Sequence, residues 1–105
     1  MRRFQRYQLD VRMVVHVFRA GVNSTIWGRS ITIGQEGIGA TLTGELDIGE
    51  VVGLEFTLPL NRQSTRLRAI VRYKHGLQCG LEFLAMNASQ REALRRVFEI
   101  LPLST

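Results

Sequence analysis

Apolar and polar residues alternate in several short runs of this sequence, and that alternation limits the folds open to it. The clearest runs cover residues 9–18, 51–58, 65–74 and 77–83. A period of two places successive side chains on opposite faces of an extended chain, so each run is typical of a half-buried β-strand. Two further β-rich runs, 25–33 and 38–42, bring the prediction to about six strands.

The period changes near the C-terminus. Four apolar residues recur there at helical spacing: Leu94, Val97, Phe98 and Leu101. Ser89 and Glu92 have the spacing of a capping box, and Pro102 follows as a stop signal. The sequence therefore predicts one amphipathic helix over 89–101, with Leu94, Val97 and Phe98 buried against the strands.

The length and the absence of an apolar segment bound the organisation of the chain. Its 105 residues suffice for one domain, and no repeat or linker divides them. No run approaches the roughly 20 apolar residues that cross a bilayer, and polar residues occupy the place where a signal peptide is apolar. With a single cysteine, Cys79, the sequence predicts a cytoplasmic protein without a membrane span.

The formal net charge is +5, and Lys74 is the only lysine among the basic residues. Arginine suits phosphates and the acceptor edge of guanine, although a GC-rich genome explains a general excess equally well. The arginines form two clusters: Arg2, Arg3 and Arg6 at the front, and Arg66, Arg68 and Arg72 in one strand. The second cluster could contact nucleic acid together with Lys74, but a solvated strand face is the favoured interpretation.

Nothing in the sequence indicates catalysis. His16 falls on the exposed phase of a strand and His75 in a turn, and neither has a partner at metal-ligand or triad spacing. The acidic residues are scattered, and there is no phosphate loop. We expect neither an enzyme, nor a metal site, nor a cofactor.

Four segments, at 2–7, 28–39, 49–56 and 73–83, together resemble the PilZ family, which comprises bacterial receptor domains for cyclic di-GMP. The resemblance spans nearly the whole chain in the expected order. It implies one all-β domain over 1–105, a small antiparallel six-stranded β-barrel with one C-terminal α-helix. A flexible basic arm would cover 1–8, the barrel 9–84 and the helix 89–101.

The family has two binding signatures, and the first is an arginine pair separated by three residues. Arg2 and Arg6 match it, with Arg3 between them. The resemblance implies that these arginines close over the ligand, bind its phosphates and contact guanine. A guanidinium can do both, because it binds phosphate bidentately and also stacks on a base.

The second signature is Asp or Asn, any residue, Ser, two residues and Gly, at the turn after the second strand. The matching positions are Thr32, Gly34 and Gly37, so only the glycine is kept. Each good polar contact to a base contributes about 1–3 kcal/mol, and the departures at Thr32 and Gly34 predict weakened binding. Gly37 also has a structural interpretation, a turn with positive φ.

Two functions stay open at this point. One is a receptor that binds cyclic di-GMP through Arg2, Arg3, Arg6, Thr32, Gly34 and Gly37 and signals to an unidentified protein effector. The alternative is a PilZ-like adaptor that contacts proteins without binding nucleotide. A segment with a similar pattern, Asn23 to Gly28, precedes the second strand and is set aside.

Overall fold

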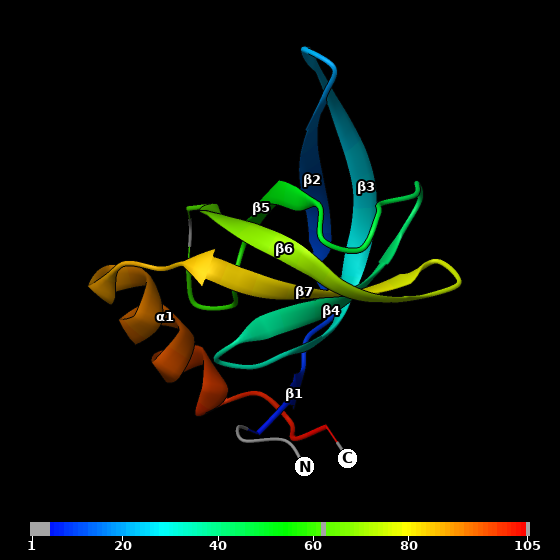
Figure 1. Cartoon of the computed structure of the whole chain (residues 1–105). Helices are drawn as coiled ribbons and strands as arrows, with labels where there is room; N and C mark the ends of the chain where they lie inside the picture. The colour runs from blue at the N-terminus through cyan, green and yellow to red at the C-terminus, as the bar shows by residue number, and fades with distance from the viewer. Residues whose placement is uncertain (1–4, 62, 105) are drawn as a thin grey trace.

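The computed structural model describes residues 5–61 and 63–104, and within them the chain forms strands and one helix (Figure 1). In chain order the elements are β1 (Tyr7–Gln8), β2 (Arg12–Arg19), β3 (Val22–Ile33), β4 (Gly37–Leu42), β5 (Val51–Phe56), β6 (Thr65–His75), β7 (Gln78–Ala85) and α1 (Ala88–Phe98).

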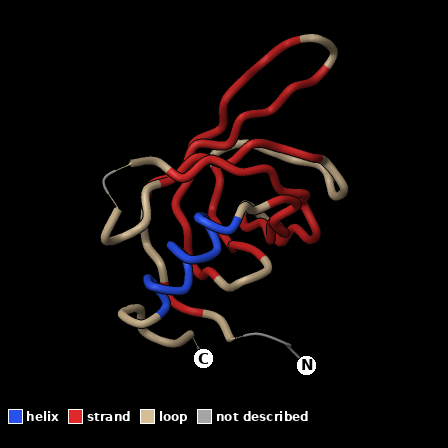
Figure 2. The backbone as a smooth tube through the Cα atoms, turned by 90° about the vertical axis from the view of Figure 1, so that its left-hand side faces the viewer, coloured by secondary structure: helices blue, strands red, loops and turns tan. Residues whose placement is uncertain are grey.

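Six of the strands form a closed antiparallel barrel. The order is β3-β2-β5-β6-β7-β4, and pairing of β3 with β4 completes the ring. The predicted six-stranded barrel with a C-terminal helix is thus confirmed, and α1 lies against one side of it (Figure 2). The two-residue strand β1 pairs with Thr32 and Ile33, just beyond the part of β3 that pairs with β2.

The apolar phase of the alternating runs fills the barrel. Met13, Val15 and Val17 of β2 point inward, and Leu9 is buried ahead of them. Ser30 is the buried polar residue of the described core. Its hydroxyl donates to the Leu9 carbonyl and accepts from the Val11 amide at 2.9 Å, so the segment between β1 and β2 is tied to β3.

One strand departs from the predicted alternation. Leu67, Ala69 and Val71 of β6 point into the barrel as expected, but Tyr73 is 55% exposed. A register shift between Val71 and Tyr73 inserts an extra residue on β6, and the phase of the strand reverses after it. Tyr73 therefore lies on the outer face, and Lys74, predicted to be exposed, is half-buried.

The helix begins earlier than predicted and has a different cap. Asn87 is the N-cap: its side chain accepts from the Gln90 amide at 2.8 Å, and the Gln90 side chain accepts from the Asn87 amide at 3.1 Å. The predicted pair of Ser89 and Glu92 is wrong, because β7 ends at Ala85 and leaves Asn87 at the turn into the helix.

The helix also ends earlier, at Phe98 instead of residue 101. Leu94 and Val97 are buried as predicted, whereas Phe98 is only half-buried. The Gln90 side chain donates to the Arg66 carbonyl at 2.8 Å and so anchors the helix to β6. In the described part of the chain, no helix has the length and apolar character that crossing a membrane requires.

An ion pair joins the projecting β2–β3 hairpin to the loop before β5. The Arg19 guanidinium donates to both carboxylate oxygens of Glu50, at 2.5 and 2.6 Å, and to the Glu45 carbonyl at 3.1 Å. Arg19 lowers the pKa of Glu50 below its ordinary value of 4.5. A carboxylate with a depressed pKa stabilises the fold above its unfolded pKa and loses that contribution as the pH falls.

We therefore expect Glu50→Gln to lower the melting temperature at neutral pH, and the deficit to shrink as the pH falls below about 4.5. In that range the wild-type carboxylate becomes protonated and no longer pairs with Arg19. Thermal melts of both proteins between about pH 7 and pH 3 measure the difference. A deficit that stays constant over this range would show that the ion pair is not its cause.

Candidate ligand-binding site

The turn between β3 and β4 is shaped by close backbone contacts. The Gly34 amide donates to the Gly37 carbonyl at 2.9 Å and closes the turn. The φ angle of Gly37 lies outside the left-handed region, so the positive-φ interpretation of this glycine is wrong. Glycine is required there for space, since a Cβ at Gly37 would lie 2.2 Å from the Leu81 carbonyl oxygen of β7.

Arg6 reaches this turn from the N-terminal segment. Its Nη2 donates to Thr32 Oγ1 at 2.8 Å, and its Nη1 donates to the Gly37 carbonyl at 3.2 Å. The structure thus brings together Arg6, Thr32, Gly34 and Gly37 of the predicted site. The other two predicted residues, Arg2 and Arg3, lie outside the described residues.

Gly34 lies directly beneath the arm. A Cβ at this position would lie 3.0 Å from the Gln5 carbonyl oxygen and 3.2 Å from Arg6 Cδ. Its φ angle is not in the left-handed region, so a side chain here would not strain the backbone. It would instead push against the segment that carries Arg6.

Next to the turn, a row of four laterally paired residues crosses the outer face of the barrel. Tyr73 of β6 pairs with Gly80 of β7, Gly80 with Gly39 of β4, and Gly39 with Thr32 of β3. We call this row the glycine strip, with Thr32 at one end and Tyr73 at the other; its two glycines are buried beneath neighbouring side chains.

Three side chains converge on Gly39. A Cβ built there would lie 3.1 Å from Thr32 Oγ1, 3.7 Å from Arg6 Nη2 and 3.9 Å from Tyr73 Oη. The Tyr73 ring lies across Gly80, where an added Cβ would lie 1.9 Å from Tyr73 Cε1. One edge of the strip therefore carries an exposed aromatic ring and the other carries a guanidinium.

The sequence did not predict Gly39, Tyr73 or Gly80 as site residues. Glycines inside strands are a signal of close backbone approach, and Gly37, Gly39 and Gly80 all lie inside strand runs. That signal places the glycines on a strip only when the register of β4 against β7 is known. Tyr73 joins them because of the register shift in β6.

A carboxylate of β7 next to the turn is balanced by an arginine. Glu82 pairs with Gly37 across β4 and β7, and Arg72 Nε donates to Glu82 Oε1 at 2.7 Å. This bond lowers the pKa of Glu82, which therefore stays ionised and neutralised at neutral pH. The partly buried Arg6 guanidinium makes the strip suited to an anionic ligand.

The segment before β2 is not a loose end where it can be described. Residues 6–8, assigned from the sequence to a flexible arm, lie between β3 and the C-terminal residues 102–104. The Gln8 amide donates to the Pro102 carbonyl at 2.8 Å, and the Ser104 amide donates to the Arg6 carbonyl at 2.9 Å. Tyr7 pairs with Ile33 on one side and forms a bridge with Leu103 on the other.

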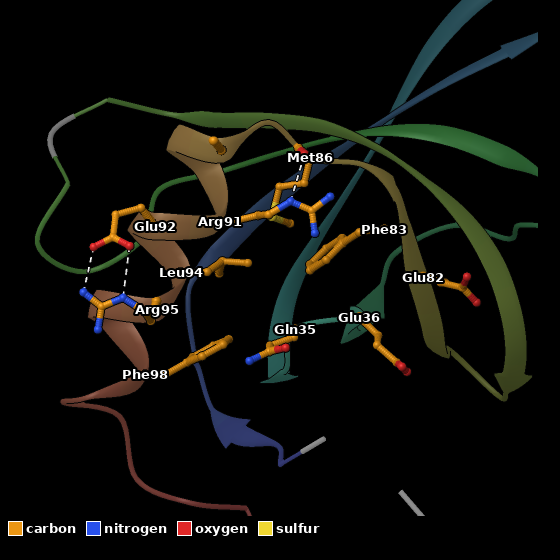
Figure 3. A pocket seen from close by; sticks show the side chains of 11 residues that line it. Gln35, Glu36, Glu82, Phe83, Met86, Arg91, Glu92, Leu94, Arg95 and Phe98 are labelled. Atoms are coloured by element: carbon orange, nitrogen blue, oxygen red, sulfur yellow. Dashed lines mark hydrogen bonds and ion pairs between the residues drawn. The ribbon is translucent and has the colours of Figure 1, made fainter. Parts of the chain in front are cut away.

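A groove of about 660 Å³ lies on the other side of the turn, between α1 and β7 (Figure 3). Gln35 and Glu36 of the turn border it, and Phe83 and Phe98 point into it. Its arginines contact the protein itself: Arg95 Nε and Nη2 donate to Glu92 at 3.0 and 2.7 Å, and Arg91 Nε donates to the Met86 carbonyl.

His16 and Cys79 are two further side chains with reactive groups, and their surroundings are typical of structural residues. His16 Nε2 lies 3.0 Å from Glu55 on the exposed barrel face. Cys79 is buried, and burial raises the pKa of its thiol, so it is a poor nucleophile at neutral pH. Across residues 5–61 and 63–104, no three His, Cys, Asp or Glu side chains cluster as a metal site would require.

The basic row of β6 is interrupted. Arg66 donates to Glu55 at 3.4 Å and Arg72 to Glu82, while Lys74 is half-buried beyond the register shift. Arg68 is exposed between them. Two of these four cations thus have a carboxylate beside them.

A closed six-stranded barrel thus holds Arg6 against one of its turns, and the sequence comparison names the family of the domain. The sequence model of the PilZ domain matches residues 1–99, so the chain belongs to the PilZ domain family. No protein in the curated set matches the chain.

Solved structures agree on the fold. The PilZ domain of YcgR from Escherichia coli, solved with c-di-GMP, has a TM-score of 0.71 at 18% identity, covering 94% of this chain and 90% of that one. The complex of YcgR with c-di-GMP has a TM-score of 0.72 at 20% identity, covering 93% and 44%. The inhibitor of motility MotI/DgrA from Bacillus subtilis has a TM-score of 0.67 at 18% sequence identity, covering 95% of this chain and 53% of that one.

Proposed function

We propose that this chain is a cytoplasmic receptor domain for cyclic di-GMP that passes the signal to a protein effector. The observation that carries the proposal is the placement of Arg6. Its guanidinium donates to Thr32 and to the Gly37 carbonyl, so Arg6 of the first family signature meets two residues of the second, distant in the sequence, at one turn. Two structures with a similar fold contain c-di-GMP, which supports the choice of nucleotide.

The chemistry of the strip fits the two parts of such a ligand. Arg6 supplies the charge and planar donor geometry that a phosphate needs. The exposed ring of Tyr73, beside Gly39, offers a surface on which a base can stack. Arg2 and Arg3 would add phosphate contacts from the part of the arm that precedes Gln5.

The departures from the second signature predict a modest affinity. The Thr32 hydroxyl offers one contact where a carboxylate would accept two hydrogens from the guanine edge. Gly34 has no hydroxyl to offer. Each lost contact weakens binding by about 1–3 kcal/mol.

Calorimetric titration of the purified chain tests the proposal. We expect heat of binding with cyclic di-GMP, and none with GTP or cyclic di-AMP at equal concentration. No binding at about 1 mM cyclic di-GMP would overturn the receptor function. A Kd of about 1 mM corresponds to a binding free energy of roughly 4 kcal/mol.

Thr32→Asp should tighten cyclic di-GMP binding by about fivefold, or roughly 1 kcal/mol. The new carboxylate accepts from guanine, but it also attracts the Arg6 guanidinium that already lies 2.8 Å from Thr32 Oγ1, which holds the gain to the low end of the range. Titration of both proteins measures the change.

Gly34→Ser is the comparison variant for Thr32→Asp. It restores the second missing side chain, yet its Cβ meets the Gln5 carbonyl at 3.0 Å and crowds the arm. We therefore expect no tightening from Gly34→Ser. A folded Thr32→Asp protein that binds more weakly than wild type would show that guanine is not read at this turn.

The same departures favour one other function, an adaptor that binds proteins without nucleotide. In that case the turn does not bind nucleotide, so no ligand requires particular side chains at Thr32 and Gly34. Arg6 then serves only to hold the arm on the turn. An effector that binds the chain equally with and without cyclic di-GMP distinguishes the adaptor from the receptor.

A further inference from the structure

The position of Arg6 depends on the C-terminal end of the chain. Arg6 belongs to the short segment of residues 6–8, which pairs with β3 at two positions. Its other edge is covered by residues 102–104, through the bonds from Gln8 to Pro102 and from Ser104 to Arg6. The Gln8 side chain adds a bond to the Leu103 carbonyl at 3.2 Å.

A ring stack connects the same segment to the helix. The rings of Tyr7 and Phe98 are nearly parallel, with centroids 4.5 Å apart and an interplanar angle of 8°. Phe98 is the last residue of α1, and the Ile100 amide donates to the Val97 carbonyl at 3.0 Å in the turn that follows. The end of the helix therefore places the Phe98 ring against Tyr7. It also determines the path of residues 100–104 across β1.

We propose that Tyr7, Phe98 and residues 102–104 form a clamp that positions Arg6 for the ligand. Tyr7 and Phe98 are positioning residues: neither lies on the glycine strip, and they act through the backbone of Arg6. The inference rests on the proposed function, because it assigns these residues to the nucleotide site described above.

The clamp has a thermodynamic consequence. Ordering a chain segment costs conformational entropy, and a segment ordered beforehand leaves that cost out of ligand binding. If the clamp opens, ligand binding must order residues 6–8 itself. Opening should therefore weaken binding by about tenfold, the size typical of coupling between two sites.

Coupling of this kind acts in both directions. A ligand held by Arg6 should stabilise the segment on which the C-terminal residues lie. The amides of Gln8 and Ser104, both bonded across the clamp, should then exchange with solvent more slowly in the presence of cyclic di-GMP. Nucleotide binding is thereby linked to the order of the chain at the end of α1, beside the groove between α1 and β7.

Phe98→Leu tests the clamp. Leucine keeps apolar bulk at this half-buried position but removes the ring stack, so we expect the barrel to melt cooperatively as wild type does. Hydrogen exchange at Gln8 and Ser104 should become faster without any ligand, and cyclic di-GMP should bind about tenfold more weakly. Phe98→Tyr keeps the stack and should behave as wild type in both measurements.

Two further variants complete the experiment. Tyr7→Leu removes the stack from the opposite side and should reproduce the effect of Phe98→Leu. Phe18→Leu makes the same exchange at the exposed hairpin tip and should change neither measurement. Wild-type exchange at Gln8 and Ser104 in both stack variants, or unchanged affinity in them, would overturn the clamp.

The two proposals can fail separately. If wild-type protein does not bind cyclic di-GMP, the proposed function fails, and hydrogen exchange in the ligand-free variants still decides whether the stack holds residues 6–8. If wild-type protein binds and the stack variants bind equally well, the receptor stands and the positioning role is lost.

Discussion

Gly37→Ala should lower the free energy of unfolding by about 3 kcal/mol, the upper end of the range for overpacking a well-packed site. The added Cβ would lie 2.2 Å from the Leu81 carbonyl oxygen and 3.1 Å from Glu82 Cα. Both are backbone atoms of β7, so no side-chain rotation relieves the contact. The paired strands β4 and β7 must separate at this point, and urea denaturation measures the loss.

Gly80→Ala is the matched control. Its Cβ would come even closer to its neighbour, 1.9 Å from Tyr73 Cε1, but that atom belongs to an exposed side chain that can swing away. We expect a clearly smaller loss of stability than for Gly37→Ala, together with weaker nucleotide binding because Tyr73 moves. Equal destabilisation by the two substitutions would contradict the account of the β4–β7 contact.

Arg6→Ala should weaken cyclic di-GMP binding more than about 100-fold, since a charge-assisted contact contributes about 1.5–3 kcal/mol and Arg6 combines such contacts with its contact to the turn. The melting temperature should change little, because the backbone bonds of residues 6–8 do not involve the side chain. Calorimetry and thermal melts of the same samples measure the two effects.

Arg68→Ala controls for the loss of positive charge. Arg68 is exposed on β6 and pairs across the sheet with Gly53, away from the glycine strip. We expect its removal to leave cyclic di-GMP affinity unchanged. Equal weakening by both substitutions would mean that the ligand responds to net charge and not to the Arg6 site.

The alternating runs predicted the strands and their buried faces, because the alternation of side chains along a strand is a local property. Met13, Val15 and Val17 lie on one face of a strand whatever its neighbours are, and all three are buried. Tyr73 could not be placed in this way. An extra residue in β6 reverses the phase only through pairing with β7, and that pairing is invisible in the run itself.

The helix start illustrates a competition between two local signals. Both Asn87 with Gln90 and Ser89 with Glu92 have capping-box spacing, and the side chains alone do not decide between them. The end of β7 at Ala85 decides, because the chain must turn immediately and Asn87 is the first residue in position to cap.

The candidate site was predictable where a motif supplied it and not where only packing did. Arg6, Thr32, Gly34 and Gly37 followed from the resemblance, and the structure places them together. The role of Gly37 was misassigned, because its neighbour is a strand 44 residues further on, at Leu81. Gly39 and Tyr73 become neighbours only through the register of three strands.

The most direct test of the central claim is a titration of ¹⁵N-labelled protein with cyclic di-GMP, followed by amide chemical shifts. We expect the largest changes at Arg6, at Thr32, Gly34 and Gly37 of the turn, and at Gly39, Tyr73 and Gly80 of the strip, with little change along β2 and β5. Changes confined to the exposed face of β6 around Arg68, or no changes while the protein stays folded, would contradict the assignment of the nucleotide site.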